Sequence, residues 1–303
     1  MMERGLMGRM KLLGLALVAV FALAAVVASG ASATPEWKGC VKTEPKNTGA
    51  YADKLCTTES STGEGAYELV PSVGKGKGFK GKGGATILHT KNPRNPNQHG
   101  IPGPEDVEIN CTRVKYEGKL ALPNLIKEAV ITFKGCKVAS APCESGIKNG
   151  VIVTNSLAGE IVDIEGGSGV GSLLEAEAGP AAPLATFTCR YMSRWGSEDL
   201  YTTNLLGSVI AERTGDVGVI SKESQEHFVV GPAWGEVTWE VSFGTVKYTP
   251  LVNLPTHQTG GPNDEHYLES EITEPGHMEP YGTLPSGLEG ITDERGEALM
   301  IVP

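Results

Sequence analysis

Beyond residue 33 the chain alternates apolar and polar residues in short runs, which is the pattern of half-buried β-strands. In one such run Val237, Trp239, Val241 and Phe243 fall on one face and polar residues fall on the other. Successive side chains of a strand point to opposite faces, so this spacing predicts a strand with one buried face. Similar runs predict strands at 67–70, 85–89, 107–114, 129–133, 151–154, 160–164, 173–177, 184–189, 207–210, 217–220, 234–248, 267–272 and 299–302.

These strands predict an all-β protein, because no apolar pattern of helical spacing persists for three turns beyond residue 33. The 40 glycines and 19 prolines suit many turns, and the connection at 155–159 suits a hairpin between its two flanking strands. We expect an antiparallel β-sandwich or barrel. The core is placed at 71–250, after a loop-rich, disulfide-stapled cap at 34–70 and before an acidic, Gly/Pro-rich segment at 251–303 that carries the last strands.

The first 33 residues have the pattern of a secretory signal peptide. Arg4, Arg9 and Lys11 precede an uncharged apolar run at 12–28, and Ala31-Ser32-Ala33 provides small residues for cleavage. The alternative is an uncleaved signal anchor, since the run is at the short end of what spans a bilayer. Cleavage near Ala33 predicts a secreted or envelope-associated protein that meets the membrane only through its signal peptide.

Six cysteines, all outside the predicted signal peptide, are an even count for an exported chain and predict disulfides. Zinc binding is the alternative use, but no C-x-x-C or nearby Cys/His pair occurs. A bridge between Cys40 and Cys56 would staple the cap and contribute about 3 kcal/mol by the chain-entropy estimate. Spacing alone does not choose the pairs among Cys40, Cys56, Cys111, Cys136, Cys143 and Cys189.

The formal net charge is −10, and it is unevenly distributed along the chain. Residues 34–150 contain 17 Lys and Arg against 12 Asp and Glu, whereas residues 151–303 contain 6 against 23. An exported chain this acidic is a poor partner for nucleic acid. The Gly76–Gly81 segment fits G-x-G-x-x-G, but no helix is legible after it, so we expect no nucleotide and no other cofactor.

Several stretches taken together resemble a group of uncharacterised exported proteins of high-GC soil bacteria. The resemblance is spread over most of the chain beyond residue 33, with order and spacing kept. The carrying residues are Cys40, Gly49–Asp53, Cys56, Gly65–Glu68, Gly83–Ile87, Ile109–Cys111, Thr132–Cys136, Cys143, Ile152–Gly159, Phe187–Cys189, Gly207–Ile210, Gly260–Pro262 and Glu297–Leu299.

The resemblance implies a secreted β-rich fold with the pairs Cys40–Cys56, Cys136–Cys143 and Cys111–Cys189, and it carries no activity. Two stretches depart from the group's pattern, 88–106 and 191–206. The second contains Trp195, which lies in a predicted loop and is a candidate for stacking on a sugar ring. Loops on rigid scaffolds often carry binding, so these stretches are where a special property of this chain is expected.

The strongest candidate for ligand contact is the basic stretch between Gly74 and Gly84, which reads as a low-complexity loop. Its lysines would contact an anionic polymer of the cell wall or another envelope component, and the alternative is a solvated loop without a ligand. The residues are Lys75, Lys77, Lys80 and Lys82.

Catalytic and metal motifs are not recognisable. The histidines of the acidic half, His227, His257, His266 and His277, have no metal-motif spacing. The carboxylates Glu236 and Glu240 lie too far apart along one strand for glycoside hydrolysis. We therefore expect a non-catalytic secreted β-domain with a binding or structural role at the envelope. The rivals are a secreted hydrolase acting on polysaccharide or peptide, and an envelope component that works only in an assembly.

Overall fold

The computed structural model describes residues 35–74, 78–92, 105–146, 148–163, 169–192, 198–230, 237–241, 244–248, 258–259, 265–266, 268–273 and 283–302. Residues 1–34, which contain the predicted signal peptide, lie outside the described residues.

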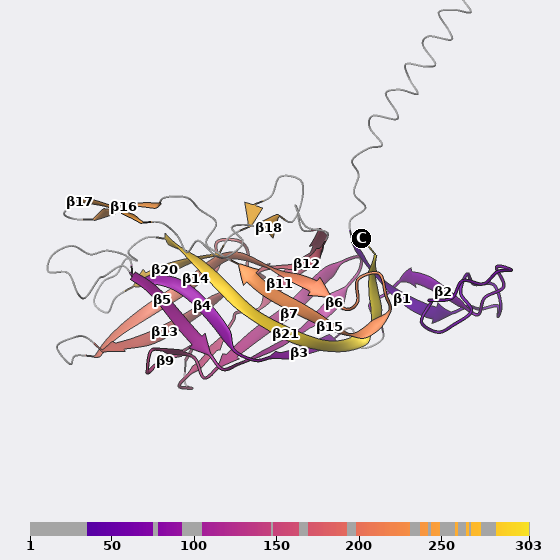
Figure 1. The fold of residues 1–303 in the computed structure, drawn as a ribbon, viewed down its shortest axis with the longest axis horizontal. Helices are drawn as coiled ribbons and strands as arrows, with labels where there is room; N and C mark the ends of the chain where they lie inside the picture. The colour runs from indigo at the N-terminus through magenta and orange to yellow at the C-terminus, as the bar shows by residue number, and fades with distance from the viewer. Residues whose placement is uncertain are drawn as a thin grey trace, which may run out of the picture. The chain divides into compact units, whose positions relative to one another are not determined.

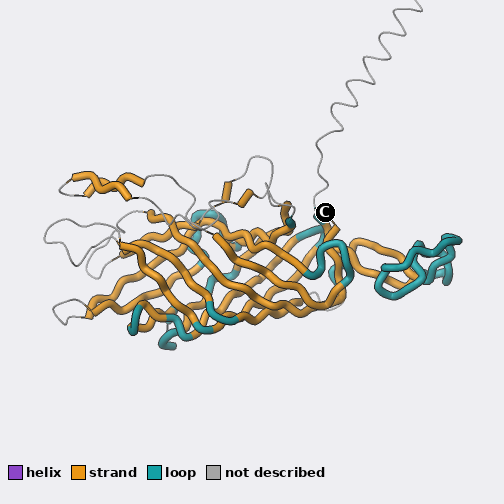
Figure 2. Tube along the Cα trace, viewed as in Figure 1, coloured by secondary structure: helices purple, strands orange, loops and turns teal. Residues whose placement is uncertain are grey.

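The described residues form strands joined by turns and contain no helix, as Figure 2 shows. No helix with the length and apolar character of a membrane span therefore occurs in this part of the chain. The strands are β1 (Glu36–Lys42), β2 (Tyr67–Pro71), β3 (Gly78–Gly83), β4 (Thr86–Asn92), β5 (Glu105–Cys111), β6 (Arg113–Ala121), β7 (Leu125–Lys134), β8 (Lys137–Val138), β9 (Ala141–Glu144), β10 (Val151–Val153), β11 (Leu157–Asp163), β12 (Val170–Ala176), β13 (Ala185–Met192), β14 (Glu198–Thr214), β15 (Ser221–Val230), β16 (Val237–Val241), β17 (Gly244–Tyr248), β18 (Gln258–Thr259), β19 (Glu265–His266), β20 (Leu268–Thr273) and β21 (Thr283–Val302).

Within the described residues, 17 strands join one antiparallel sheet, while β16–β17 and β18–β19 form small sheets of their own. This confirms the all-β antiparallel prediction. Two long strands organise the sheet: β14 pairs with β12, β13, β15 and β20, and β21 pairs with β1, β3, β4, β15 and β20. Figure 1 shows β21, in yellow, curving past β15, β3 and β4. The last strands of the chain are thus part of the main sheet.

Period-two patterning builds the buried face of this sheet. On β6, Val114 and Tyr116 are buried while Lys115 and Glu117 are exposed. Across the ladder, the Phe79 ring of β3 meets the Tyr116 ring edge-on, with centroids 4.8 Å apart. Gly118 lies opposite Phe79 in register, and a Cβ there would come within 2.8 Å of the Phe79 ring. The aromatic ring therefore occupies the space that the glycine leaves.

The basic stretch predicted as a loop is in part a strand, which corrects that prediction. Residues 78–83 form β3, which pairs with β6 on one side and with β21 on the other. Phe79 and Gly81 face the interior, whereas Lys80 and Lys82 are exposed. Glycine is unfavourable in isolated strands, but hydrogen bonding on both edges overrides that preference here.

The predicted hairpin between 151–154 and 160–164 is also wrong. β10 and β11 both pair antiparallel with β7, so they run in the same direction and continue one another. Thr154 bridges the interruption between them: its N–H donates to the Ile131 carbonyl at 2.9 Å, and its hydroxyl accepts from the Ile131 N–H at 2.9 Å. The hydroxyl thus gives the Ile131 N–H an acceptor that the break in the ladder would otherwise leave it without.

Four further strand predictions need correction. The cap at 34–70 is predicted to be loop-rich with no strand before residue 67, yet it contains β1, which pairs with β2 and with the end of β21. The stretch 107–114 is divided between β5 and β6 at Thr112. Residues 217–220 form no strand, whereas the unpredicted β15 follows them.

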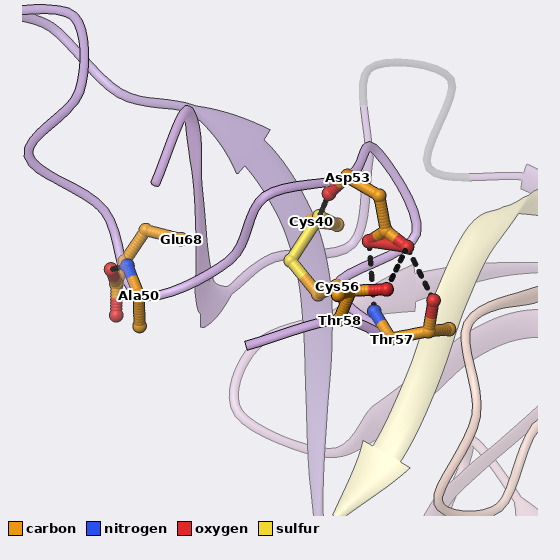
Figure 3. The surroundings of a disulfide bond; sticks show 7 residues. All are labelled: Cys40, Ala50, Asp53, Cys56, Thr57, Thr58 and Glu68. Carbon is orange, nitrogen blue, oxygen red and sulfur yellow. Dashed lines mark hydrogen bonds between the residues drawn. A yellow bond between two sulfur atoms is a disulfide. The ribbon is translucent and has the colours of Figure 1, made fainter. Parts of the chain in front are cut away.

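A disulfide-closed loop region lies between β1 and β2, shown in Figure 3. Cys40 bonds Cys56, as the resemblance implied. The Asp53 carboxylate accepts hydrogen bonds from the Thr57 N–H at 2.9 Å and from the Thr57 hydroxyl. These bonds favour the charged form, so they hold the pKa of Asp53 below its ordinary value even though the carboxyl is exposed. The predicted stapled loop region therefore exists, with a local polar network beside the bridge.

The other four cysteines form a single row across four neighbouring strands. On the β5–β8 ladder, Asn110 pairs with Lys137, which places Cys111 opposite Cys136. The β8–β9 hairpin places Cys136 opposite Cys143, whose N–H donates to the Cys136 carbonyl at 3.0 Å. Cys143 in turn pairs with Cys189 of β13. All four side chains are buried. We call these four residues the cysteine row, in the order Cys111, Cys136, Cys143 and Cys189.

The cysteine row explains why the other two implied disulfides, Cys136–Cys143 and Cys111–Cys189, are wrong. The bonds are Cys111–Cys136 and Cys143–Cys189, each between neighbours at one end of the row. Strands lie about 4.8 Å apart, so Cys111 and Cys189 are separated by about 14 Å. Cysteines whose Cα atoms are more than about 7 Å apart cannot be bridged without backbone movement. The implied pattern would therefore leave both end cysteines unbonded.

Candidate functional site

The sequence candidates for ligand contact are only partly described. Lys75, Lys77 and Trp195 lie outside the described residues. Lys80 and Lys82 lie on β3 with exposed side chains. They line a groove of about 870 Å³ on the outer face of the sheet, formed by β3, β6, β15 and β21 with the turn after β14. This groove is the candidate site.

Strand register arranges the groove side chains in two rows. One row runs Glu223–Arg295–Lys80–Glu117 across β15, β21, β3 and β6. The second row places Lys115 of β6 opposite Lys82 of β3. Neighbouring strands are about 4.8 Å apart and residues two apart on a strand about 6.8 Å apart. Four cations, Lys80, Lys82, Lys115 and Arg295, therefore occupy one compact block of the surface.

The groove carries an excess of positive charge. Arg295 pairs with Glu223 at 3.1 Å, and both side chains are largely exposed, at 74% and 68%. Lys80, Lys82 and Lys115 form no ion pair with another residue in the described ranges. Glu117 is the other carboxylate that lines the groove, and Asp293 of β21 stands opposite Lys82 in register, so the four cations outnumber the carboxylates by one. The charge of these lysines is therefore available to an external anion.

A buried charged cluster lies directly behind the floor of the groove. The floor includes Tyr116 and Ser224, whose side chains point inward and are buried. The Ser224 hydroxyl accepts a bond from Arg213 Nη2 at 2.8 Å. Arg213 Nη1 donates to Glu226 at 2.7 Å, and its Nε donates to Asp216 at 3.1 Å.

The cluster is completed by an aromatic ring and a second serine. The Arg213 guanidinium carbon lies 5.1 Å from the centre of the Trp37 ring, a cation–π distance. The Ser172 hydroxyl donates to Glu226 at 2.6 Å. Bonds to side chains of β15 and of the turn at 216 fix the guanidinium, and Ser172 of β12 holds the Glu226 carboxylate. This order holds β14 and β15 in place and so fixes one wall of the groove.

No family model, curated protein or solved structure matches this chain. The resemblance to exported bacterial proteins stays a prediction, and the groove has to be interpreted from its own chemistry.

The two groove carboxylates are poorly placed for glycoside hydrolysis. Glu117 and Glu223 stand at opposite ends of one row, three strand spacings or about 14 Å apart at the backbone. Arg295 and Lys80 occupy the positions between them. Glycosidases hold their carboxyls about 5 Å or 6.5–9.5 Å apart. The groove suits binding of an anion better than this acid–base chemistry.

Two other features of the described residues offer no ligand site. An apolar cavity of about 30 Å³ lies in the core between β4, β7, β13 and β14, with Leu88 and Phe187 among its lining. An apolar space of this size has room for a water-sized molecule at most and stays dry. No group of three His, Cys, Asp or Glu side chains within the described ranges is arranged to hold a metal ion. His257 and His277 lie outside those ranges.

Two of the four groove cations were predicted from the sequence as candidates for ligand contact. Lys80 and Lys82 stood out because they lie in a basic repeat. Lys115 and Arg295 are isolated in the sequence, and they join the site only because β6 and β21 are the two ladder partners of β3. The period-two pattern at 113–117 was the available signal for Lys115, since it places that residue on the outer face.

Proposed function

We propose that the protein is an exported, non-catalytic β-domain that binds an anionic polymer of the cell envelope in the groove of β3, β6, β15 and β21. The observation that carries this proposal is the block of four cations, three of them lysines that form no ion pair within the described residues, on a chain whose net charge is −10. Cations grouped on an otherwise acidic protein select for a negatively charged partner at that place.

The length of the groove and the predicted extracellular location of the protein also favour an anionic polymer as the partner. A groove crossing four strands is open along its length, and an extended polymer can lie in it without its ends being recognised. Three disulfides are consistent with an oxidising, extracellular environment, where wall polymers occur. Among such polymers a phosphodiester chain is the best match, because each repeat presents a compact charge to which a lysine ammonium can bind.

The test compares the full chain with two triple variants that change the net charge equally. Lys80→Glu, Lys82→Glu and Lys115→Glu together reverse the groove. Lys46→Glu, Lys54→Glu and Lys137→Glu reverse exposed lysines elsewhere. Binding to purified poly(glycerol phosphate) is measured by calorimetry at low salt, with a neutral glucan as the ligand control.

We expect the groove variant to bind at least about tenfold more weakly, because it loses three surface contacts of about 0.5 kcal/mol each and gains repulsion. The matched variant should bind as the unaltered protein does, apart from a small uniform effect of net charge. Equal loss in both variants, or equal binding of the neutral glucan, would refute groove recognition of an anion.

A further inference from the structure

We infer that the cysteine row is a disulfide relay, in which opening one bridge allows the remaining bridge to move to the centre of the row. Each end cysteine has one cysteine neighbour, while Cys136 and Cys143 each have two, one already bonded and one belonging to the other bridge. The central pair is in direct backbone contact through the hydrogen bond from the Cys143 N–H to the Cys136 carbonyl.

The central bond fits the geometry of the sheet. Residues directly opposite each other in an antiparallel ladder project their side chains to the same face, with Cα atoms about 4.5–5.5 Å apart. That separation lies within the usual disulfide range of about 4.4–6.8 Å. Cys136 and Cys143 can therefore bond with the backbone as it stands, whereas bonds between next-nearest members of the row span about 9–10 Å and cannot form.

The reaction is thiol–disulfide exchange. A dithiol reductant donates two electrons to Cys111–Cys136, whose S–S bond breaks to give two cysteine thiols while the dithiol becomes a disulfide. The Cys136 thiolate then attacks Cys143 Sγ, forming Cys136–Cys143 and displacing the Cys189 thiolate, which takes up a proton. This second step moves a bond without net oxidation or reduction. It is intramolecular, so it needs no second encounter with a thiol from the solvent.

The consequence is a change in which strands are tied together. The native bonds tie β5 to the turn at Cys136 before β8, and β9 to β13. The shifted bond closes the β8–β9 hairpin on itself and frees both β5 and β13. A single two-electron reduction thus removes both of the cross-links that join this hairpin to its neighbouring strands, although only one disulfide is lost.

Two pairs of full-length variants test the relay. Cys111→Ser and Cys136→Ser remove the same bridge, but only Cys111→Ser leaves a thiol, Cys136, beside the surviving bond. Cys189→Ser and Cys143→Ser repeat the contrast at the other end. Each protein is held at about pH 8.5, near the ordinary thiol pKa, until exchange is complete. It is then alkylated in acid, and its disulfides are mapped by mass spectrometry.

We expect Cys136–Cys143 in at least about one molecule in ten of Cys111→Ser and of Cys189→Ser, and in none of their partners, which lack one of these sulfurs. Only the native surviving bridge in all four variants would overturn the inference. Since a variant can fail to fold, the unaltered protein is also treated with limiting dithiothreitol. A one-bridge-reduced species with free Cys111 and Cys189 is expected, and a species retaining only a native bridge would contradict the relay.

Discussion

At the scale of single residues, Arg213 is a buried charge held by several partners. Its side chain is 5% exposed, and those of its partners Asp216 and Glu226 are 6% and 0% exposed. Burial removes the hydration of all three charges, so their mutual bonds and the bonds with Ser172 and Ser224 have to replace it. The cluster therefore matters for stability mainly because removal of one charge would leave an opposite charge buried without its counter-charge.

We predict that Arg213→Ala lowers the free energy of unfolding by about 3–5 kcal/mol, because two buried carboxylates lose their counter-charge. Urea unfolding followed by circular dichroism measures the change. Lys119→Ala is the matched control, since Lys119 pairs with Glu128 and both are exposed. That variant should lose about 1 kcal/mol or less. Losses of similar size in the two variants would show that the buried cluster has no special role.

At the scale of elements, close backbone packing makes particular glycines necessary within strands. Gly159 lies on β11 opposite Leu174 of β12, next to a register shift on the β7 side. A Cβ at Gly159 would lie 1.8 Å from the Leu173 carbonyl oxygen, which is backbone and cannot turn aside. A side chain there must push the two strands apart.

Gly159→Ala should therefore destabilise the protein by at least about 2 kcal/mol, as overpacking with a backbone shift does. Gly84→Ala is the comparison, because a Cβ at Gly84 meets nothing within 4 Å. Its midpoint of thermal unfolding should stay close to that of the unaltered protein. If Gly159→Ala leaves this midpoint unchanged as well, β11 and β12 are less closely packed than described.

The strands also differ in how well the sequence predicts them. Strands whose inward residues are large and apolar, such as β5 and β7, were recognised from alternation alone, whereas most of β6 was missed. β3 was missed because its inward residues are Phe79 and Gly81, and a small inward residue leaves no apolar signal. Most of β14 and β21 was missed because each pairs with several strands, and hydrogen bonding rather than apolar content makes them continuous.

Pairing between distant strands was beyond the reach of local patterns. The cysteine row depends on β9 lying between β8 and β13, which no spacing between Cys111 and Cys189 reveals. The groove likewise depends on β21 adding to β3 from the far end of the chain. The lysines of β3 were found from composition, but their partners required the topology.

At the scale of the whole molecule, the fold turns an uneven charge distribution along the chain into a local site. The groove lysines come from the basic part before residue 150, and Arg295 comes from the acidic part after it. Exposed charges are screened beyond about 8 Å at physiological ionic strength. A compact block of cations can therefore attract an anion while the net charge of the protein stays negative.

The most direct test of groove binding is lysine footprinting of the unaltered protein. The full chain is acetylated with and without saturating poly(glycerol phosphate), and the reactivity of each lysine is measured by mass spectrometry. We predict that the bound polymer lowers the reactivity toward acetylation several-fold at Lys80, Lys82 and Lys115, while Lys46, Lys54 and Lys137 react as before. Groove binding would be contradicted if the polymer bound while the three groove lysines kept their reactivity. Protection of other lysines in their place would contradict it as well.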